Sequence, residues 1–243
     1  MGTEAKFRRI LVKLSGEALM GSQPFGIEPS VASYIAGELA GVFELGVQIG
    51  VVVGGGNIIR GVSAHEQGID RITGDSMGML ATVINALALS SAVEQRGIDT
   101  RVQTAIEMHQ VAEPFIRRRA IRHLEKGRIV VFAGGTGHPF FTTDTAAALR
   151  ANEIQAEVLM KATKVDGVYT ADPVKDSAAE LIPRLSYQEV LTRGLKVMDA
   201  AAISLCTESK IPVQIVNISK PGILERVVLG DEVGSWIGPG EAV

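Results

Sequence analysis

Residues 49–57 read Ile-Gly-Val-Val-Val-Gly-Gly-Gly-Asn, a short apolar run followed at once by three consecutive glycines. Short apolar runs rich in Val and Ile are typical of strands buried on both faces of a parallel sheet. Similar runs recur along the chain at Ile10–Leu14, Ile129–Ala133, Val158–Met160 and Val213–Val216. Each run ends in glycine or polar residues, so each is predicted to be a buried strand.

Helical patterns separate the predicted strands. In Ser30–Leu45 the apolar residues recur with a period close to the 3.6 residues of an α-helix. Further helices are predicted at Met77–Val93, which is apolar on most of its surface, and at Glu113–Lys126 and Val197–Lys210. This alternation predicts a three-layer α/β sandwich with a mainly parallel central sheet and helices on both faces. No linker or repeat divides the chain, so residues 1–243 are expected to form one domain.

The composition narrows the class of protein. With 243 residues, 46% of them hydrophobic, the chain can build a large core. Its net charge of −3 disfavours a nucleic-acid binder with a broad basic surface. Cys206 is the single cysteine, which excludes an intramolecular disulfide and suits a reducing compartment. Because neither a secretion signal nor a membrane span is found, we expect a cytoplasmic protein that binds neither nucleic acid nor membrane.

Four turns carry residues that suit an anionic ligand. In the first, Lys13 stands at the end of a predicted strand and is followed by Leu14, Ser15 and Gly16. An ammonium group beside backbone N–H groups suits a phosphate whose charge grows during transfer. Taken alone, however, this segment is better interpreted as an ordinary strand end whose lysine faces solvent.

The second turn, Gly54-Gly55-Gly56-Asn57, also follows a predicted strand, and Arg60 comes shortly after it. Glycines let the backbone approach a ligand closely and expose consecutive N–H donors. If a helix begins here, its N-terminus adds partial positive charge, and Arg60 can bind phosphate oxygens. The alternative is a tight turn without a ligand, which is less favoured because glycine carries an entropic cost.

The third turn covers residues 134–144, Gly-Gly-Thr-Gly-His-Pro-Phe-Phe-Thr-Thr-Asp. Its glycines and threonine hydroxyls could hold an anion, while Thr142, Thr143 or Asp144 could cap the following helix. In the alternative interpretation these residues are only caps and the two phenylalanines fill the core. The fourth turn, residues 161–173, holds two lysines, a tyrosine and two aspartates that could serve a nucleotide, although Asp-Gly and Asp-Pro are also routine turn signals.

Motifs of other nucleotide-binding classes are missing from the sequence. It contains no G-x-x-x-x-G-K-[ST] phosphate loop, and no G-x-G-x-x-G follows the first predicted strand. The four histidines are scattered, which disfavours a zinc site built by the protein. The residues alone therefore indicate anion sites at the ends of several strands, suited to phosphoryl transfer between two anionic molecules.

Over nearly its whole length the chain resembles the bacterial uridylate (UMP) kinases, which belong to the amino-acid kinase family. The matching segments, whose order and spacing agree with that family, are residues 13–19, 54–57, 74–82, 136–137, 139–144, 161–169, 171–173 and 195–199. The resemblance implies an enzyme of pyrimidine biosynthesis that phosphorylates UMP to UDP with ATP. The N-terminal part would mainly hold UMP and the C-terminal part mainly ATP.

The resemblance also implies roles for individual residues. Lys13 and Arg60 would stabilise the charge on the transferring group. ATP would be held by Lys13, Leu14, Ser15, Gly16, Gly56, Arg60, Thr163, Tyr169 and Asp172. UMP would be held by Gly55, Asp75, Thr136, Gly137, His138, Pro139, Phe140, Phe141, Thr142 and Thr143. Asp144 and Asp199 are similar to supporting acidic positions of the family.

Cofactor, partners and regulation follow from the same resemblance. Mg²⁺ would be carried with ATP and held largely by its phosphates, without a metal site on the protein. Similar bacterial enzymes are hexamers that UTP inhibits and GTP activates. The family's GTP-responsive loop corresponds to Gly21, Ser22, Gln23, Pro24, Phe25 and Gly26. His138 stands where the family usually has asparagine, so UMP binding is expected to depend on pH.

Two competing functions are weighed against this one. The first is a kinase of the same family that phosphorylates a carboxylate or carbamate, which the resemblance of Asp75 and residues 136–144 to a nucleotide acceptor site disfavours. The second is a non-catalytic nucleotide sensor. Lys13 and Arg60 disfavour it, because a sensor has no transition state to stabilise.

Overall fold

A nine-stranded sheet forms the centre of the computed structural model, which describes residues 4–59, 68–171, 173, 175–176, 178–195 and 197–240. The strands lie in the order β4-β3-β5-β2-β1-β6-β10-β11-β9. Their bounds are β1 Arg9–Leu14, β2 Gln48–Val53, β3 Thr100–Thr104, β4 Glu113–Pro114, β5 Ile129–Ala133, β6 Val158–Thr163, β9 Arg184–Ser186, β10 Val213–Asn217 and β11 Ser235–Gly238. Among the strand pairings of the described residues in this sheet, only that of β10 with β11 is antiparallel.

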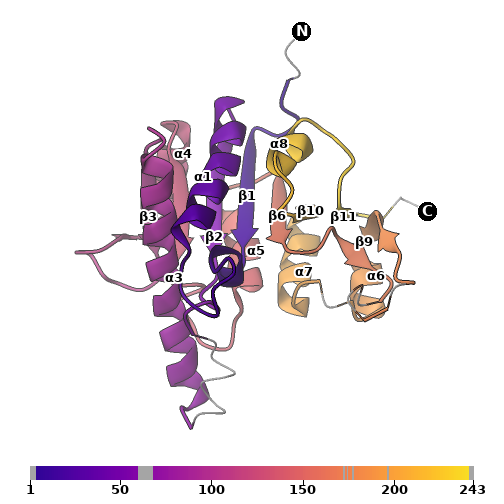
Figure 1. The fold of residues 1–243 in the computed structure, drawn as a ribbon, viewed down its shortest axis with the longest axis horizontal. Helices are drawn as coiled ribbons and strands as arrows, with labels where there is room; N and C mark the ends of the chain where they lie inside the picture. Colours follow the sequence, from indigo (N-terminus) through magenta and orange to yellow (C-terminus); the bar gives the residue numbers. More distant parts are fainter. Residues whose placement is uncertain are drawn as a thin grey trace.

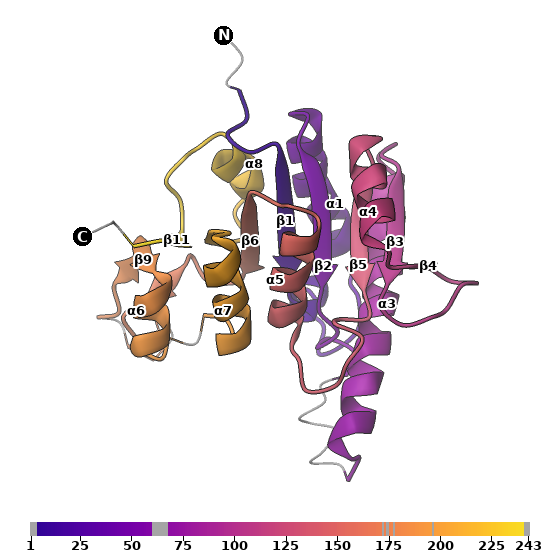
Figure 2. The same cartoon turned by 180° about the vertical axis from the view of Figure 1, so that it is seen from behind.

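Helices cover both faces of this sheet, as Figures 1 and 2 show from opposite sides. One face carries α1 (Pro29–Glu44), α3 (Arg71–Glu94) and α8 (Ile223–Val228), and the other carries α4 (Arg117–Glu125), α5 (Thr143–Glu153), α6 (Tyr187–Thr192) and α7 (Ala200–Ser209). A 3-10 turn, η1 (Gly16–Leu19), follows β1, and β7 (Val168–Tyr169) pairs with β8 (Leu181–Ile182) as a small hairpin. The predicted three-layer α/β sandwich with a mainly parallel sheet is confirmed.

Two apolar cores lie on the two faces of the sheet. Ile10, Val12 and Leu14 of β1 point into the core under α1, α3 and α8, whereas Leu11 points into the core under α4 to α7. Successive side chains of a strand point to opposite faces, so a central strand covered on both sides must be apolar throughout. This explains why the five central strands could be predicted from continuous apolar runs.

The strand β3 (Thr100–Thr104) was not predicted, because its sequence Thr-Arg-Val-Gln-Thr is mostly polar. Two of its buried polar side chains have nearby partners: Thr100 donates its hydroxyl to Glu94 at 2.8 Å, and the backbone N–H of Ile106 donates to the hydroxyl of Thr104 at 3.1 Å. Among the described residues, Oε1 of the buried Gln103 has no hydrogen-bond partner. The strands β9 and β11 were missed because they are short, with three and four residues respectively.

Three predicted helices have different beginnings in the structure. The helix α3 begins at Arg71 rather than Met77, because the carboxylate of Asp70 accepts the N–H groups of Ile72 and Thr73 at 3.1 Å each. The helix predicted from Glu113 begins at Arg117, since Glu113–Pro114 forms the extended strand β4. A proline disfavours the helical conformation of the residue that precedes it, here Glu113. The helix predicted from Val197 begins at Ala200, with Asp199 as its N-cap.

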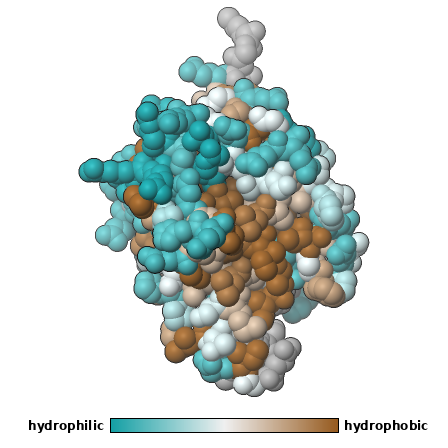
Figure 3. Space-filling model, turned by 90° about the vertical axis from the view of Figure 1, so that its left-hand side faces the viewer, coloured by the Kyte–Doolittle hydropathy of each residue, from teal (hydrophilic) through white to brown (hydrophobic). Residues whose placement is uncertain are grey.

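The long helix α3 has an apolar surface of its own. By length and hydropathy it could cross a membrane, but 44% of its most apolar window is buried inside the protein. The exposed remainder includes Ile72, Leu80, Ile84 and Leu87. Figure 3 shows apolar surface gathered into a band on this side of the molecule. The composition of α3 is therefore explained by packing on one side and by an exposed apolar stripe on the other.

The order of the strands creates a crevice at one edge of the sheet. After β5 the chain crosses back past β2 and β1 and enters β6 on the far side of β1. In open α/β sheets, ligands bind outside the carboxyl ends of the strands where the strand order reverses in this way. Here that point lies between the ends of β1 and β6, at the lower end of the β1 arrow in Figure 1.

Candidate active site

Two lysines meet at this crevice. Lys13 of β1 and Lys161 of β6 are register partners in adjacent parallel strands, and both lie on the face covered by α5. The carboxylate of Asp144, in the first turn of α5, lies 2.7 Å from Nζ of Lys13 and 2.6 Å from Nζ of Lys161. Nζ of Lys161 also donates to the carbonyl oxygen of Val197. Two ammonium groups therefore share one carboxylate at the point where a ligand would enter.

The three charged groups change one another's titration. Burial disfavours the Asp144 carboxylate, but the neighbouring Lys13 and Lys161 outweigh burial and hold the pKa of Asp144 below its ordinary value. For Lys161, burial dominates over the attraction of Asp144, so the pKa of this lysine is lowered. Asp144 stays ionised at neutral pH and fixes the direction of both ammonium groups, so the site is ordered before a ligand binds.

Two helix N-termini face the same crevice. Thr142 caps α5 by accepting the N–H of Asp144 at 3.0 Å, which confirms the predicted capping role of the third turn. Asp199 caps α7 by accepting the N–H of Ala202 at 2.8 Å, and it also accepts the hydroxyls of Thr142 and Thr145. Asp199 thereby joins the two N-termini, whose partial positive charges favour anions. A hollow of about 370 Å³ lies here, lined by Lys13, Thr142, Thr143, Asp144, Lys161, Val197, Met198 and Asp199.

The glycine turn after β2 packs tightly against its neighbours. A Cβ on Gly16 would lie 2.7 Å from the backbone N of Gly56 and 2.8 Å from the carbonyl O of Gly54. A Cβ on Gly55 would lie 2.6 Å from the carbonyl O of Gly78 in α3. These glycines are therefore required first for close approach between β1, α3 and the turn itself, while Gly55 and Gly56 also line a neighbouring hollow.

That neighbouring hollow, of about 200 Å³, gathers most of the residues predicted to hold UMP. It is lined by Gly55, Gly56, Ile59, Asp75, Gly78, Met79, Thr82, Gly135, Thr136, His138, Phe141, Thr142 and Thr143. Gly137, Pro139 and Phe140 are not among the lining residues, and Gly137 packs against Ala105 instead. Thr136 and His138 are held together because Oγ1 of Thr136 donates to the carbonyl of His138 and accepts its N–H, both at 3.2 Å.

Asp75 ties the third turn to α3. Its carboxylate accepts the backbone N–H of Phe140 at 2.8 Å and Nε of Arg71 at 2.8 Å. Phe140 adopts a left-handed backbone conformation with φ of 71°, which is strained for a residue with a side chain. Its ring and that of Phe141 are 62% and 54% exposed, so the alternative that these two residues fill the core is wrong.

A third hollow, of about 540 Å³, follows β6. It is lined by Lys161, Thr163, Val165, Gly167, Val168, Tyr169, Thr170, Ala171, Pro173, Gly194, Leu195, Val197 and Ile215. Both apolar and polar residues line it, and its volume suits a nucleoside. It shares Lys161 and Val197 with the central hollow, and the central hollow shares Thr142 and Thr143 with the 200 Å³ hollow. The three hollows therefore form a continuous series with Lys13, Asp144 and Lys161 in the middle.

Comparison with known proteins decides the family. A model described as the amino acid kinase family matches residues 8–217. The chain belongs to the amino acid kinase family. Among solved structures it is similar to the UMP kinase of Bacillus anthracis, with 38% identity, 98% of each chain covered and a TM-score of 0.94.

Two further solved structures extend this similarity. The UMP kinase of Ureaplasma parvum shares 33% identity over 95% of this chain and 98% of its own, with a TM-score of 0.89. The uridylate kinase of Archaeoglobus fulgidus shares 33% identity over 94% of this chain and 99% of its own, with a TM-score of 0.74. This amino acid kinase is therefore similar to these kinases over nearly the whole of each chain.

Of the residues predicted to hold ATP, Leu14 and Ser15 line none of these hollows, whereas Thr163 lines the hollow of about 540 Å³. The side chain of Leu14 is fully buried, so this residue can meet a ligand only through its backbone. Ser15 precedes η1 and makes no side-chain capping bond. Thr163 uses its hydroxyl locally, donating to the carbonyl of Val165 at 2.9 Å. Arg60 and Asp172 lie outside the residues that the structure describes.

The segment 21–26, predicted to respond to GTP, lies beside the glycine turn. The N–H of Gly26 donates to the carbonyl of Asn57 at 2.8 Å, and Nδ2 of Asn57 donates to the carbonyl of Gly26 at 2.7 Å. Gly21 has φ of 59°, and a Cβ there would collide with the carboxylate of Glu28, which accepts the N–H of Ser22 at 3.1 Å. The segment is thus built against the site, although nothing in this geometry is specific to guanine.

The carboxylates near the site and the thiol of Cys206 bear on metal binding and on nucleophilic catalysis. Among the described residues, no cluster of three or more His, Cys, Asp or Glu side chains is placed to hold a metal ion. The carboxylates of Asp144 and Asp199 are already engaged by lysines, hydroxyls and an N–H group. This donor set fits Mg²⁺ that is held mainly by nucleotide phosphates. Burial raises the pKa of the Cys206 thiol to about 12, so this side chain stays protonated and is not a nucleophile.

Sequence reasoning missed several residues that build the site. Lys161 was noted only as one of two lysines in the fourth turn, yet it pairs with Asp144 directly. Thr82 of α3 accepts the N–H of Gly134 at 2.7 Å. Asn85 of the same helix donates to the carbonyl of Gly54 at 2.6 Å. For Thr82 and Asn85, the signal available in the sequence was that they are polar residues within an otherwise apolar helix.

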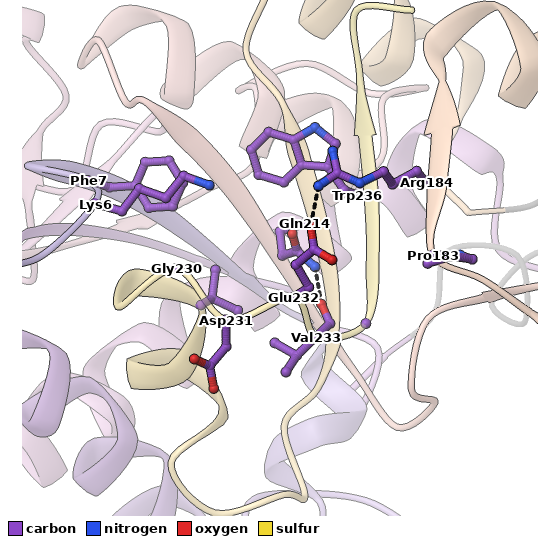
Figure 4. A pocket seen from close by; sticks show the side chains of 12 residues that line it. Lys6, Phe7, Pro183, Arg184, Gln214, Gly230, Asp231, Glu232, Val233 and Trp236 are labelled. Atoms are coloured by element: carbon purple, nitrogen blue, oxygen red, sulfur yellow. Dashed lines mark hydrogen bonds and ion pairs between the residues drawn. The ribbon is translucent and has the colours of Figure 1, made fainter. Parts of the chain in front are cut away.

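A fourth hollow, of about 190 Å³, lies elsewhere (Figure 4). It lies between Lys6 and Phe7, at the amino end of β1, and β9 to β11, and shares no lining residue with the other three. Nζ of Lys6 lies 5.4 Å from the ring centroid of Trp236, and Arg184 pairs with Glu232. Since its cations already have partners within the protein, this hollow is not assigned to the active site.

Proposed function

We propose that this amino acid kinase transfers the γ-phosphoryl group of ATP to UMP and forms ADP and UDP. The observation that carries the proposal is the Lys13–Asp144–Lys161 assembly, which lies between two hollows at the point where the strand order reverses. The larger hollow would take the nucleoside of ATP and the smaller one would take UMP. The similarity to three UMP or uridylate kinases over nearly whole chains supports this choice of acceptor.

The chemistry needs positioning and charge neutralisation more than a base. A phosphate oxygen of UMP, already anionic, forms a bond to the γ-phosphorus while the bond from that phosphorus to the β,γ-bridging oxygen breaks and ADP leaves with the electron pair. Lys13 and Lys161 stabilise the charge that spreads over the transferring group, and the N-termini of α5 and α7 add to this. The carboxylate of Asp144 binds both ammonium groups and fixes their positions. Arg60 is proposed as a further cation on the phosphates.

Mg²⁺ is proposed to arrive with ATP. When bound, it supplies neutralisation of the phosphate oxygens, a role that complements the lysines. Asp144 and Asp199 are proposed as supporting residues that orient Lys13, Lys161 and the two helix N-termini. His138, Thr136 and the backbone of the third turn are proposed to contact UMP, and Asp75 to contact its ribose in exchange for one of its present partners.

The experiment that tests the role of the assembly is turnover in Lys13→Ala. Removing one of two cations leaves Asp144 paired with Lys161, so the variant is expected to fold. Loss of an ammonium that stabilises the transferring group should lower kcat by about 10²–10³-fold. Lys126→Ala, at an exposed lysine outside the site, is the matched control and should keep wild-type turnover. Activity near that of wild type in Lys13→Ala would refute the assignment.

Two other functions make different predictions. A carboxylate or carbamate kinase of this family would turn over an amino-acid acceptor and not UMP. A non-catalytic nucleotide sensor would bind ATP but form no ADP with any acceptor. The series of hollows around Lys13 and Lys161 favours catalysis, because two ammonium groups held by one buried carboxylate suit a developing anion better than a resting ligand.

We further propose that each chain forms one domain and that six chains assemble into a homo-hexamer. The exposed side chains of Ile72, Leu80, Ile84 and Leu87 recur along one side of α3, and a contiguous apolar stripe of this kind suits contact with a second copy. Sedimentation should show a hexamer for wild type. Leu80→Glu should yield smaller species, because it would place a carboxylate in the interface.

The proposal also covers regulation by nucleotides and the cellular compartment of the enzyme. GTP is proposed to activate through residues 21–26 and UTP to inhibit, in the cytoplasm and within pyrimidine nucleotide synthesis. The bonds between Gly26 and Asn57 support a link between that segment and the glycine turn. Turnover measured with and without each nucleotide tests both effects, and rates unchanged by GTP and UTP would refute them.

A further inference from the structure

Two asparagines form a closed pair beside the glycine turn. Nδ2 of Asn57 donates to Oδ1 of Asn85 at 3.0 Å, and Nδ2 of Asn85 donates to Oδ1 of Asn57 at 2.6 Å. The second bond from Asn85 goes to the carbonyl of Gly54 at 2.6 Å, and the second from Asn57 goes to the carbonyl of Gly26 at 2.7 Å. Each amide group therefore donates twice and accepts once, with no hydrogen left over.

The pair is buried in apolar surroundings. The exposed fraction is 2% for Asn57 and 0% for Asn85, and the neighbours of Asn85 on α3, such as Ala86 and Leu89, belong to the apolar core. A buried amide is costly unless all its hydrogen bonds are made, and an aliphatic side chain would pack a helix against a sheet without that cost. What the amides add to packing is direction, since their bonds hold particular carbonyl groups in place.

The groups held in place belong to the proposed phosphate site. The glycine turn is fixed on one side by Asn85 through Gly54 and on the other by β1, because the N–H of Gly54 donates to the carbonyl of Leu14 at 2.9 Å. A Cβ on Gly16 would lie 2.5 Å from Oδ1 of Asn57, so no free space separates the pair from the turn that follows Lys13. A shift of either asparagine would move both turns.

The same helix holds the acceptor hollow. Thr82 accepts the N–H of Gly134 at 2.7 Å, and Asp75 accepts that of Phe140 at 2.8 Å. Together with Asn85, these side chains tie two separate segments of the site, the glycine turn and the third turn, to α3. The distance between the glycine turn and the third turn is therefore set by one helix.

We propose that Asn57 and Asn85 are positioning residues for phosphoryl transfer, which hold the N–H groups of the glycine turn at a fixed distance from Lys13 and from the acceptor hollow. The inference rests on the proposed function for its catalytic readout. Neither side chain touches the reacting atoms. Their effect comes from geometry, since a misplacement of about 1 Å in such a site can cost about 10²-fold in rate.

The test compares Asn57→Ala, Asn85→Ala and the double variant with a matched control. Ser90→Ala is that control, because Ser90 is a buried polar residue of the same helix whose hydroxyl bonds Thr100 and not the site. Each asparagine variant is expected to lower kcat with UMP by about 10–100-fold, with smaller changes in KM for either substrate. The double variant should lose no more than the worse single one, because the pair acts as a unit. Ser90→Ala should keep wild-type kcat.

A second readout does not depend on catalysis. Amide hydrogen exchange without nucleotide should become faster in peptides that cover residues 20–28 and 50–58 in both asparagine variants, and stay unchanged there in Ser90→Ala. If an alanine variant does not fold, Asn85→Asp keeps the shape of the side chain and removes its two donated hydrogen bonds.

The outcomes separate this inference from the proposed function. Wild-type protein that forms no ADP with UMP would refute the function, and hydrogen exchange would still decide the role of the pair. Active wild type with folded asparagine variants of unchanged kcat would overturn the inference alone. So would losses that multiply in the double variant, or exchange that is unaltered at residues 20–28 and 50–58.

Discussion

Lys13 of β1 and Lys161 of β6 are register partners in neighbouring parallel strands, and one carboxylate, that of Asp144, lies within 2.7 Å of both ammonium groups. Two like charges this close are unfavourable without a counter-ion. The buried carboxylate thus makes the two-lysine arrangement possible, and it comes from a helix that also contributes its N-terminus to the site.

Replacing Asp144 by Asn should damage both stability and turnover. The substitution leaves two mostly buried cations without their carboxylate, and removing one partner of a buried ion pair typically costs about 3–5 kcal/mol. We expect a loss of that size in the free energy of unfolding, measured by urea denaturation, and a fall in kcat. Glu232→Gln, which breaks the exposed pair with Arg184, is the control and should change stability by less than about 0.5 kcal/mol. Similar stability of both variants would contradict this account of the site.

The contribution of Asp144 should disappear in acid. Because its pKa is lowered in the folded protein, its stabilising effect is fully present above the ordinary pKa of an unfolded aspartate, about 3.9, and is lost as the pH falls through the folded pKa. The difference in unfolding free energy between wild type and Asp144→Asn should therefore be constant from about pH 5 to 8 and shrink below about pH 4. A difference that persists undiminished at pH 3 would show that another group is responsible.

Gly16 and Gly78 should respond oppositely to alanine. A Cβ on Gly16 would lie within 3.0 Å of three atoms of the glycine turn, whereas a Cβ on Gly78 in α3 would meet nothing within 4 Å. Gly16→Ala should lower stability by about 1–3 kcal/mol through overpacking. Gly78→Ala should raise it by about 0.5–1 kcal/mol, because alanine favours a helix interior. Thermal unfolding of both variants checks the pair, and a neutral Gly16→Ala would refute the close approach of the two turns.

His138 should make UMP binding sensitive to pH. His138 lines the smaller hollow, and imidazole is the side chain whose charge ordinarily changes between about pH 5 and 8. Affinity for UMP, measured by calorimetry, is expected to vary across that range in wild type and to be flat in His138→Asn. Equal and flat profiles for both proteins would eliminate the histidine as a determinant.

The central strands of the sheet could be predicted because the sequence pattern that marks them is local. Strands such as Ile129–Ala133 are buried on both faces and are apolar throughout, so their sequence resembles no exposed element. The strand Thr100–Thr104 could not be recognised in this way, since its buried side chains are polar and depend on partners such as Glu94 that lie in another element. The start of α3 was missed because Asp70 lies before an apolar pattern that only becomes regular later.

The site was only partly readable from the sequence. The glycine turns and Lys13 stand at strand ends, where a local pattern is enough to suggest anion binding. The partnership of Lys161 with Asp144 depends on the register of two strands and on the packing of α5, none of which is local. The same holds for Asn85, whose partners Gly54 and Asn57 lie 31 and 28 residues away in the chain.

The central claim is tested most directly by ADP formation from Mg·ATP with a panel of acceptors: UMP, CMP, dUMP, aspartate and acetylglutamate. We predict turnover with UMP far above that with the other acceptors. Turnover only with aspartate or acetylglutamate would keep the family and contradict the proposed substrate. No ADP with any acceptor, from protein that binds ATP tightly, would contradict catalysis and favour a nucleotide sensor.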